Sequence, residues 1–330
     1  MTAGSAPQPR DRGLLQRVPL VSKQRPVVMA FVVAALLFAG TAVYSPGFAS
    51  TRNIGALLTQ AALIGFVALG QTLVIIGGGI DLSIPWVVNG AAVLTTVWAG
   101  GHNGRLPWVI PAVLLAGVIV GTVNGIGVTV LRVPPIIMTL GMLAMVQGGL
   151  LVYTAGTGGQ LAPTTIDRIA AHGLGPVTGA TVIWLLAAVG ATVLLSWTVF
   201  GRRLYALGIS RTTAKFSGVN ERAVITMTYS ISGLTAAVAG ILLAGYVQQS
   251  YLGMGDPYLF ASVAAVAIGG ASILGGTGNY LGTVAGALTL TVLTGMLPIL
   301  GLSPAVLDIV YGVVILIAIT IARVAGTSRA

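Results

Sequence analysis

The chain has 330 residues, of which 56% are hydrophobic and only 7% are charged, and its formal net charge is +10. Soluble domains carry about 25% charged residues, so this composition excludes an ordinary soluble protein and indicates a polytopic membrane protein. The absence of cysteine excludes disulfides and thiolate metal sites, and the basic residues are too few to indicate a nucleic-acid-binding protein.

The first 26 residues are rich in Pro, Arg and Gln, which predicts a disordered cytoplasmic tail before the first apolar run. A cleaved signal peptide within 1–50 is the alternative. The charged region that precedes the apolar run is long for a signal peptide, and the run exceeds a typical signal core. We therefore expect the first helix, near 27–44, to be retained as a membrane span.

The charge-free runs that follow predict an all-α integral membrane protein, because each crossing of a bilayer needs about 20 apolar residues. The run 257–307 is too long for one helix, and the glycines between 275 and 278 with Asn279 predict a turn inside it. Ten transmembrane helices are expected, near 27–44, 54–76, 80–100, 107–131, 134–154, 177–199, 223–247, 257–274, 280–298 and 305–322. The membrane domain then spans 27–323, followed by a short cytoplasmic tail, 324–330.

The basic residues test this number of crossings, since they concentrate in cytoplasmic segments of membrane proteins. With both termini in the cytoplasm, the outer side holds only Arg52, Arg105 and Arg168. The inner side then holds Arg10, Arg12, Arg17, Lys23, Arg25, Arg132, Arg202, Arg203, Arg211, Lys215, Arg222, Arg323 and Arg329. This asymmetry supports ten crossings.

The stretch GGGIDLSIP, residues 77–85, interrupts the run with a carboxylate, Asp81. The glycines allow the chain to leave one helix, and Asp81 with Ser83 can cap the next helix, where Pro85 is tolerated in the first turn. Capping is sufficient to explain the aspartate. A role in gating or ion coupling is the alternative.

Several other polar side chains lie inside predicted spans, where exposure to lipid is costly. Each can hydrogen-bond a passing substrate or bridge two helices, and composition leaves both interpretations open. With Asp81, the candidates for a substrate pathway are Gln71, Asn89, Asn124, Thr139 and Gln147.

The one long hydrophilic segment between spans is 201–222, on the inner side by the charge count. Helix-capping residues near 210 and Gly218 predict a short helix near 210–217. The segment is either an ordinary charged loop or a docking surface for a cytoplasmic protein. The longest outer loop, 155–176, is expected to be irregular with one short helical turn.

The predicted helices also divide into two blocks of four, helices 2–5 and 7–10, with opposite starting directions. GGID at 78–81 and GMGD at 253–256 occur at corresponding places in the two blocks. Inverted repeats are common in transporters, whose broken helices line the substrate path. We therefore expect an inverted repeat, with chance similarity in Gly-rich sequence as the alternative.

The sequence contains no recognisable catalytic, metal-binding or nucleotide-binding motif. There is no phosphate-binding loop, no metal-ligating cluster and no nucleophile–base arrangement, so we expect neither a cofactor nor enzymatic activity in this chain. A transporter without an ATP site or a clear ion relay is expected to draw its energy from a partner protein.

Four ordered blocks resemble one family: QTLVIIGGGIDLSIP, LRVPPIIMTLGMLAMVQGG, GRRLYALGISRTTAKFSGVN and VAAVAIGGASILGGTGNYLGTVAGAL. They resemble the membrane permeases of bacterial ABC importers for ribose, xylose and related sugars, over about 54–322. The resemblance implies a multi-pass protein of the bacterial inner membrane. It also implies a cytoplasmic ABC ATPase, an extracytoplasmic sugar-binding protein and a second permease copy or paralogue as partners.

The resemblance further implies that 201–222 is the coupling loop that contacts the ATPase. The residues that match the family pattern there are Gly201, Tyr205, Ala206, Gly208, Ser217, Gly218 and Asn220. Ser210 departs from the asparagine usual in ribose permeases. Permeases for rhamnose, inositol and the furanosyl autoinducer belong to the same broad family, so the expected substrate is a monosaccharide or related small polyol. An ion-coupled secondary transporter that uses Asp81 is the rival interpretation.

Overall fold

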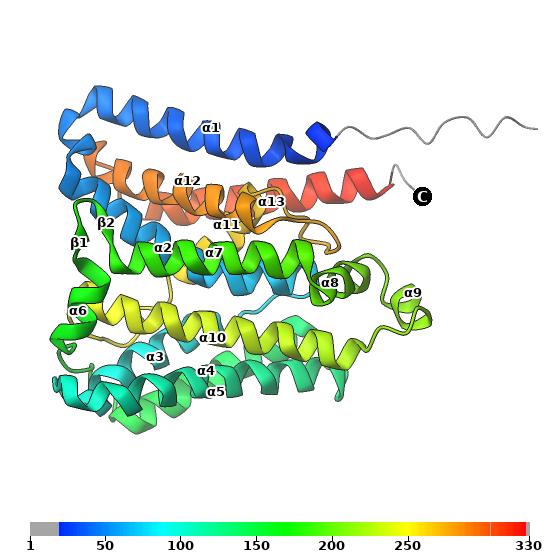
Figure 1. Ribbon diagram of the computed structural model, residues 1–330, viewed down its shortest axis with the longest axis horizontal. Coiled ribbons are helices and arrows are strands. Elements are labelled where there is room, and N and C mark those ends of the chain that lie inside the picture. The colour runs from blue at the N-terminus through cyan, green and yellow to red at the C-terminus, as the bar shows by residue number, and fades with distance from the viewer. Residues whose placement is uncertain (1–19, 304, 328–330) are drawn as a thin grey trace, which may run out of the picture.

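The computed structural model describes residues 20–303 and 305–327, which form a bundle of helices (Figure 1). Within this part of the chain the elements are α1 (Leu20–Tyr44), η1 (Pro46–Ala49), α2 (Thr51–Ile76), α3 (Ile84–Ala99), η2 (Asn103–Arg105), α4 (Leu106–Thr129), α5 (Pro135–Thr154), α6 (Thr164–Ala171), β1 (Gly173–Leu174), β2 (Val177–Thr178), α7 (Gly179–Trp197), α8 (Val199–Ile209), α9 (Arg211–Phe216), α10 (Glu221–Val247), α11 (Tyr258–Ile268), α12 (Tyr280–Ile299) and α13 (Ala305–Thr327).

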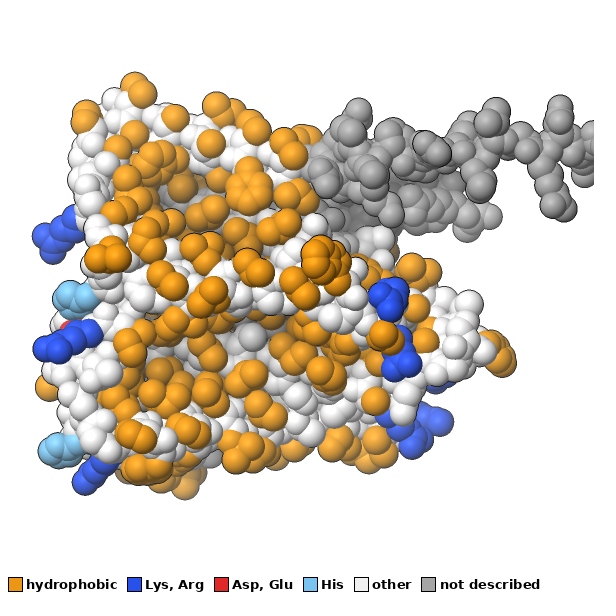
Figure 2. All heavy atoms as spheres, in the orientation of Figure 1, with side chains coloured by type: hydrophobic (Ala, Val, Ile, Leu, Met, Phe, Trp, Pro, Cys, Tyr) orange, Lys and Arg blue, Asp and Glu red, His pale blue; other side chains and the backbone are white. Residues whose placement is uncertain are grey.

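The bundle has two ends, which we name by what they carry. The hairpin end carries α6 and the antiparallel pair β1–β2, and the α9 end carries α8 and α9 (Figure 1). The start of α1 and the end of α13 both lie at the α9 end. Charged side chains gather at the two ends of the face seen in Figure 2, and the surface between them is apolar. This distribution is that of a protein embedded in a bilayer.

The core of the bundle is α2, whose middle and last turns are buried almost completely. Helices α10, α11, α12 and α7 contact it, and α10 also packs along α3 and α4. By contrast, α5 and the outer faces of α4 and α7 expose large apolar side chains, among them Ile137, Leu186 and Val189. Apolar side chains that face outward are stable in lipid, so both the core of the bundle and its lipid-facing surface are made of apolar residues.

Glycines let α4 and α10 approach closely. Gly117 and Gly121 of α4 face the backbone of Gly233 and Tyr229 of α10, with no space for a side chain between them. Small residues drive such contacts in membranes, because lipid gives no hydrophobic force between apolar helices.

Replacing Gly121 with valine is therefore expected to lower the free energy of unfolding by about 1 to 3 kcal/mol, since the new Cβ would overlap the Tyr229 carbonyl. The matched control is Gly190→Val on α7, where nothing lies near a new Cβ. Thermal unfolding of the purified protein in detergent measures both variants. Equal losses for the two valines would contradict the close α4–α10 contact.

Each of the ten helices predicted from the sequence has a counterpart, α1–α5, α7 and α10–α13. Within the described residues, seven helices are long and apolar enough to cross a membrane, whereas α3, α11 and the part of α13 up to Thr320 are shorter apolar helices. The structure thus establishes a mostly helical protein with seven candidate spans.

Several predicted boundaries were wrong. Helix α3 begins at Ile84 and not near 80, and α11 ends at Ile268 and not near 274, because Gly269 and Gly270, the latter with φ +82°, turn the chain. Helix α1 begins at Leu20, inside the predicted tail 1–26, and α13 continues to Thr327, since helices extend past the membrane-buried stretch that hydropathy detects. Residues 1–19 and 328–330 of the predicted tails lie outside the described residues.

The predicted outer loop 155–176 contains more structure than one helical turn. It holds the eight-residue α6, strand β1 and a bridge between Leu161 and Gln249. Helix α8 was also not predicted as a separate element.

Candidate functional site

A buried polar cluster surrounds the non-helical segment 77–83 between α2 and α3. The Asp81 side chain is 1% exposed. Its Oδ1 accepts hydrogen bonds from the Ser83 backbone N–H at 3.0 Å and from the Ser83 hydroxyl at 2.6 Å, and its Oδ2 accepts one from Ser232 of α10 at 2.8 Å. A buried carboxylate needs such donors because burial removes its water.

Two further candidates join the same segment. The Asn124 amide of α4 donates to the Ser83 hydroxyl at 2.9 Å, and Thr139 of α5 donates to the Ile80 carbonyl at 3.3 Å. The Asn124 Oδ1 atom and the Tyr229 hydroxyl are buried and have no hydrogen-bond partner in the part of the chain that the structure describes. Segment 77–83 is thereby tied to α4, α5 and α10.

Capping by Asp81 occurs differently from the prediction. Ser83 is the N-cap of α3 and makes no side-chain cap bond, while Asp81 accepts the backbone N–H of that N-cap residue. Its other carboxylate oxygen, Oδ2, accepts the hydrogen bond from Ser232 of α10, so Asp81 links segment 77–83 to another helix. Ser232 could not be identified from the sequence, since 151 positions separate it from Asp81.

Asn89, fully buried on α3, contacts the second non-helical segment, 248–257. With its amide placed to satisfy both atoms, it donates to the Tyr251 carbonyl at 3.0 Å and accepts from the Gly253 N–H at 2.8 Å. Gly255 lies directly against the backbone at Pro85, where a side chain would not fit. Segment 248–257 therefore enters the bundle beside the first turns of α3.

The two remaining candidates are separate from these clusters. Gln71 on α2 is fully buried, and among the described residues neither its oxygen nor its nitrogen has a hydrogen-bond partner. An unsatisfied buried amide costs about 1 to 3 kcal/mol, which marks Gln71 as unusual. Gln147 is half-buried on α5. The structure thus brings Asp81, Asn124 and Thr139 together and leaves Asn89, Gln71 and Gln147 apart.

The predicted coupling residues lie at the α9 end, where their local structure is well defined. Thr198 caps α8 by accepting the Gly201 N–H, Ser210 caps α9 by accepting the Thr213 N–H, and Asn220 caps α10 by accepting the Ala223 N–H. The predicted helix near 210–217 is confirmed as α9, which ends before Gly218, where φ is +77°.

Helix α8 is seated on the ends of the core helices. The Tyr205 hydroxyl donates a hydrogen bond to the Gly278 carbonyl at 2.8 Å. Gly208 lies against the carbonyl of Ile76, which is the last residue of α2. Gly276 donates to that same carbonyl at 2.9 Å. A displacement of α8 would therefore press on the end of α2 and on the turn 269–279. Ala206 is half-buried on this helix, and Ser217 bonds back to the Thr213 carbonyl.

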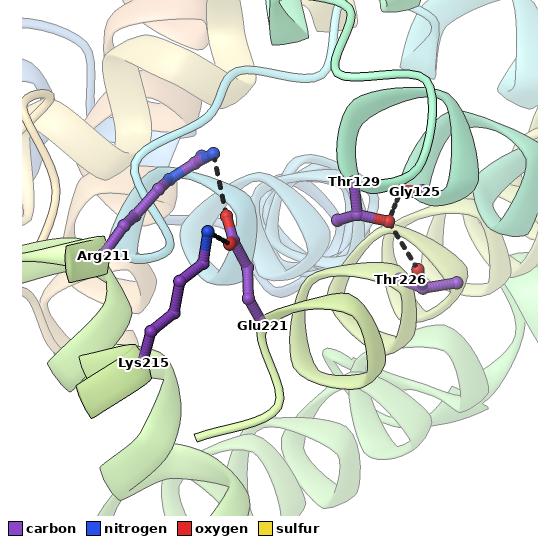
Figure 3. A network of polar contacts seen from close by, with 6 residues as sticks. All are labelled: Gly125, Thr129, Arg211, Lys215, Glu221 and Thr226. Carbon is purple, nitrogen blue, oxygen red and sulfur yellow. Dashed lines mark hydrogen bonds and ion pairs between the residues drawn. The ribbon is translucent and has the colours of Figure 1, made fainter. Parts of the chain in front are cut away.

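Helix α9 is held by ion pairs to the first residue of α10 (Figure 3). Glu221 accepts from Arg211 at 3.2 Å and pairs with Lys215 at 2.7 Å. Two apolar side chains on the short helices α8 and α9 face outward: Phe216 of α9 is 89% exposed and Ile209 of α8 is 73% exposed. An exposed aromatic beyond the apolar belt favours contact with another protein.

Replacing Glu221 with glutamine should loosen α9, because both cations lose their anionic partner. The pairs are partly exposed, so the expected loss of stability is small, about 1 kcal/mol or less. Limited trypsin digestion detects the local effect as faster cleavage after Lys215. Unchanged cleavage after Lys215 would contradict an anchoring role for Glu221.

Comparison with known proteins gives consistent results over most of the chain. Residues 53–319 match the family described as branched-chain amino acid transport system / permease component. The ribose import permease protein RbsC of Haemophilus influenzae is 32% identical over 91% of this chain and 94% of its own length. The corresponding Escherichia coli K12 protein is 33% identical over 88% of this chain and 92% of its own length.

The autoinducer 2 import system permease protein LsrC of Enterobacter sp. strain 638 is 31% identical over 87% of this chain and 83% of its own length. No solved structure matches the chain significantly.

Proposed function

The chain belongs to the permease family described as branched-chain amino acid transport system / permease component, and from that membership we infer how it works. It is the permease subunit of an ABC sugar importer in the bacterial inner membrane. It is not an enzyme, because ATP is hydrolysed by a separate ATPase subunit, and a substrate-binding protein delivers the substrate.

The proposed substrate is a monosaccharide similar to ribose, xylose or rhamnose, or a related small polyol. The names of two similar proteins support this class, since they are import permeases for ribose and for autoinducer 2. The proposed assembly is a dimer of two permease copies, or of this chain with a paralogue.

The proposed topology has ten crossings, with both termini and the α9 end in the cytoplasm, and the permease domain spans 27–323. Supporting this, the basic residues of 201–222 lie at the same end of the bundle as the start of α1 and the end of α13. The proposed inverted repeat relates α2–α5 to α10–α13. It is supported by two long buried helices, α2 and α10, each followed by a non-helical segment and a short helix. Gly78 and Gly253, at the same place in GGID and GMGD, both have positive φ.

The proposed mechanism is alternating access driven at the α9 end. The observation that carries it is the contact of Gly208 with the last residue of α2, because it links the coupling loop 201–222 to the most buried helix. When the ATPase subunits close, α8 and α9 move, and the end of α2 and the turn 269–279 move with them. Segments 77–83 and 248–257 are the non-helical parts of the bundle that can re-orient.

The polar candidates have two proposed roles on this pathway. Asp81, Asn89, Asn124 and Thr139 hold the two non-helical segments in place. Gln71, whose amide has no partner in the described structure, and Gln147 on α5 are the proposed contacts for substrate hydroxyl groups.

The substrate is tested through the binding protein encoded beside this permease. Its melting temperature is measured with ribose, xylose, rhamnose, inositol and an amino acid such as leucine. A sugar or polyol is expected to raise it by several degrees. Stabilisation by leucine alone would contradict the proposed substrate class.

A further inference from the structure

A large cavity in the described residues opens at the α9 end and is strongly basic. It has a volume of about 650 Å³ and lies between the α4–α5 connection and the start of α10. Arg132, Arg211, Lys215 and Arg222 line it, against the single carboxylate of Glu221. Glu221 is already paired with Arg211 and Lys215 (Figure 3). Arg132 and Arg222 therefore supply positive charge that Glu221 does not balance.

The backbone adds to the positive electrostatic potential of the cavity. Asn220 and Glu221 place the N-terminus of the long helix α10 in the cavity wall, and a helix N-terminus carries partial positive charge. Arg132 adopts φ +58°, a left-handed conformation that is costly for a residue with a side chain. The chain thus keeps a cation at a position where glycine would be less strained.

The residues that adjoin the cavity lining in the α4–α5 connection are apolar and exposed. Val130 and Leu131 before Arg132, and Ile136 and Ile137 after the two prolines, are exposed large apolar side chains. An occupant of this site would therefore meet a basic pocket and, beside it, a surface suited to acyl chains. Basic pockets between membrane helices on the cytoplasmic side bind anionic headgroups.

We propose that this cavity binds the phosphate-bearing headgroup of an anionic lipid, with Arg132 and Arg222 as the main contacts and the acyl chains along Val130, Leu131, Ile136 and Ile137. The proposal rests on the proposed function only for the assignment of the α9 end to the cytoplasm. A lipid bound here would touch both the α4–α5 connection and the α9–α10 connection, and would stabilise the coupling loop against the bundle.

The test uses the full chain purified in a neutral detergent, with no ATPase present. Its melting temperature is followed by tryptophan fluorescence as dioleoylphosphatidylglycerol is added, with dioleoylphosphatidylcholine and inorganic phosphate as comparison probes. Phosphatidylglycerol is expected to raise the melting temperature saturably, and phosphatidylcholine is expected to have little effect.

The site variant is Arg132→Gln with Arg222→Gln, and the matched control is Arg52→Gln with Arg105→Gln at the other end of the bundle. Each basic residue contributes roughly a fivefold change in lipid affinity. The site variant should therefore need roughly 25-fold more phosphatidylglycerol for the same rise in melting temperature, and the control variant should need no more than the unmodified protein. Glu221→Gln, which removes the only carboxylate of the cavity, is expected to tighten binding and gives a second test if the double variant does not fold.

Equal lipid responses in the site variant and the control would overturn the proposal. An equal shift with inorganic phosphate, lost in the site variant, would assign the cavity to a soluble anion and overturn the lipid assignment. In a separate co-purification with the ATPase, loss of the ATPase by a site variant whose lipid response is intact would assign the cavity to the ATPase interface and also overturn the proposal. Because the melting assay needs neither transport nor ATPase, failure of this proposal is separable from failure of the proposed function.

Discussion

Replacing Phe216 with aspartate is expected to separate this permease from its ATPase. The Phe216 ring is 89% exposed on α9, and burying a phenylalanine side chain contributes about 1.5 to 3 kcal/mol. Placing a carboxylate there removes that contribution and adds the cost of desolvating a charge. The association should weaken roughly 10- to 100-fold, measured as the loss of co-purified ATPase and of ATP-dependent uptake.

The matched control is Leu174→Asp, because Leu174 is 90% exposed but lies on β1 at the hairpin end. This variant should retain the ATPase in full. Retention of the ATPase by Phe216→Asp, or its equal loss in both variants, would contradict docking at α9.

Removing the Asp81 side chain is expected to have the largest effect on folding. Asp81→Ala leaves the Ser83 N–H and the hydroxyls of Ser83 and Ser232 without their acceptor, at about 1 to 3 kcal/mol for each group that finds no other partner. Relief of burying a carboxylate offsets part of this. A net loss of about 2 kcal/mol is expected, measured by thermal unfolding in detergent.

Two further variants separate structure from charge. Ser232→Ala should cost less than Asp81→Ala, and the double variant should lose less than the sum, because the two side chains share one hydrogen bond. Asp81→Asn keeps the shape and one acceptor oxygen, so it should fold and retain most uptake. Normal folding of Asp81→Asn with abolished uptake would contradict a structural role and favour the ion-coupled rival.

Local sequence signals were enough to predict α9 almost to the residue. Ser210 provides the cap and Gly218 the left-handed exit, and both act within one turn of the helix they bound. The existence of the ten apolar helices could also be predicted from the sequence, because a helix in lipid requires apolar side chains whatever the tertiary structure.

Tertiary contacts decided what the sequence could not indicate. Residues 269–274 carry no charge, so the hydropathy pattern extended the predicted helix through them, but Gly269 and Gly270 turn the chain. The turn is then held by contacts distant in sequence, since Gly276 donates to the Ile76 carbonyl and Gly275 lies against Gly208. Likewise, Asp81 carried a recognisable local signal, but its bond to Ser232 depends on the approach of α10 to segment 77–83. Phe216 was overlooked because one phenylalanine in a hydrophilic segment is unremarkable until its exposure is known.

The central claim is that a separate ATPase, acting at the α9 end, drives transport through this chain. Uptake of the sugar identified with the binding protein tests it in proteoliposomes that contain the chain, the ATPase and the binding protein. Uptake is expected to require ATP and the ATPase and to persist when an uncoupler collapses ion gradients. Uptake by the chain alone, driven by an ion gradient and abolished by the uncoupler, would contradict the claim.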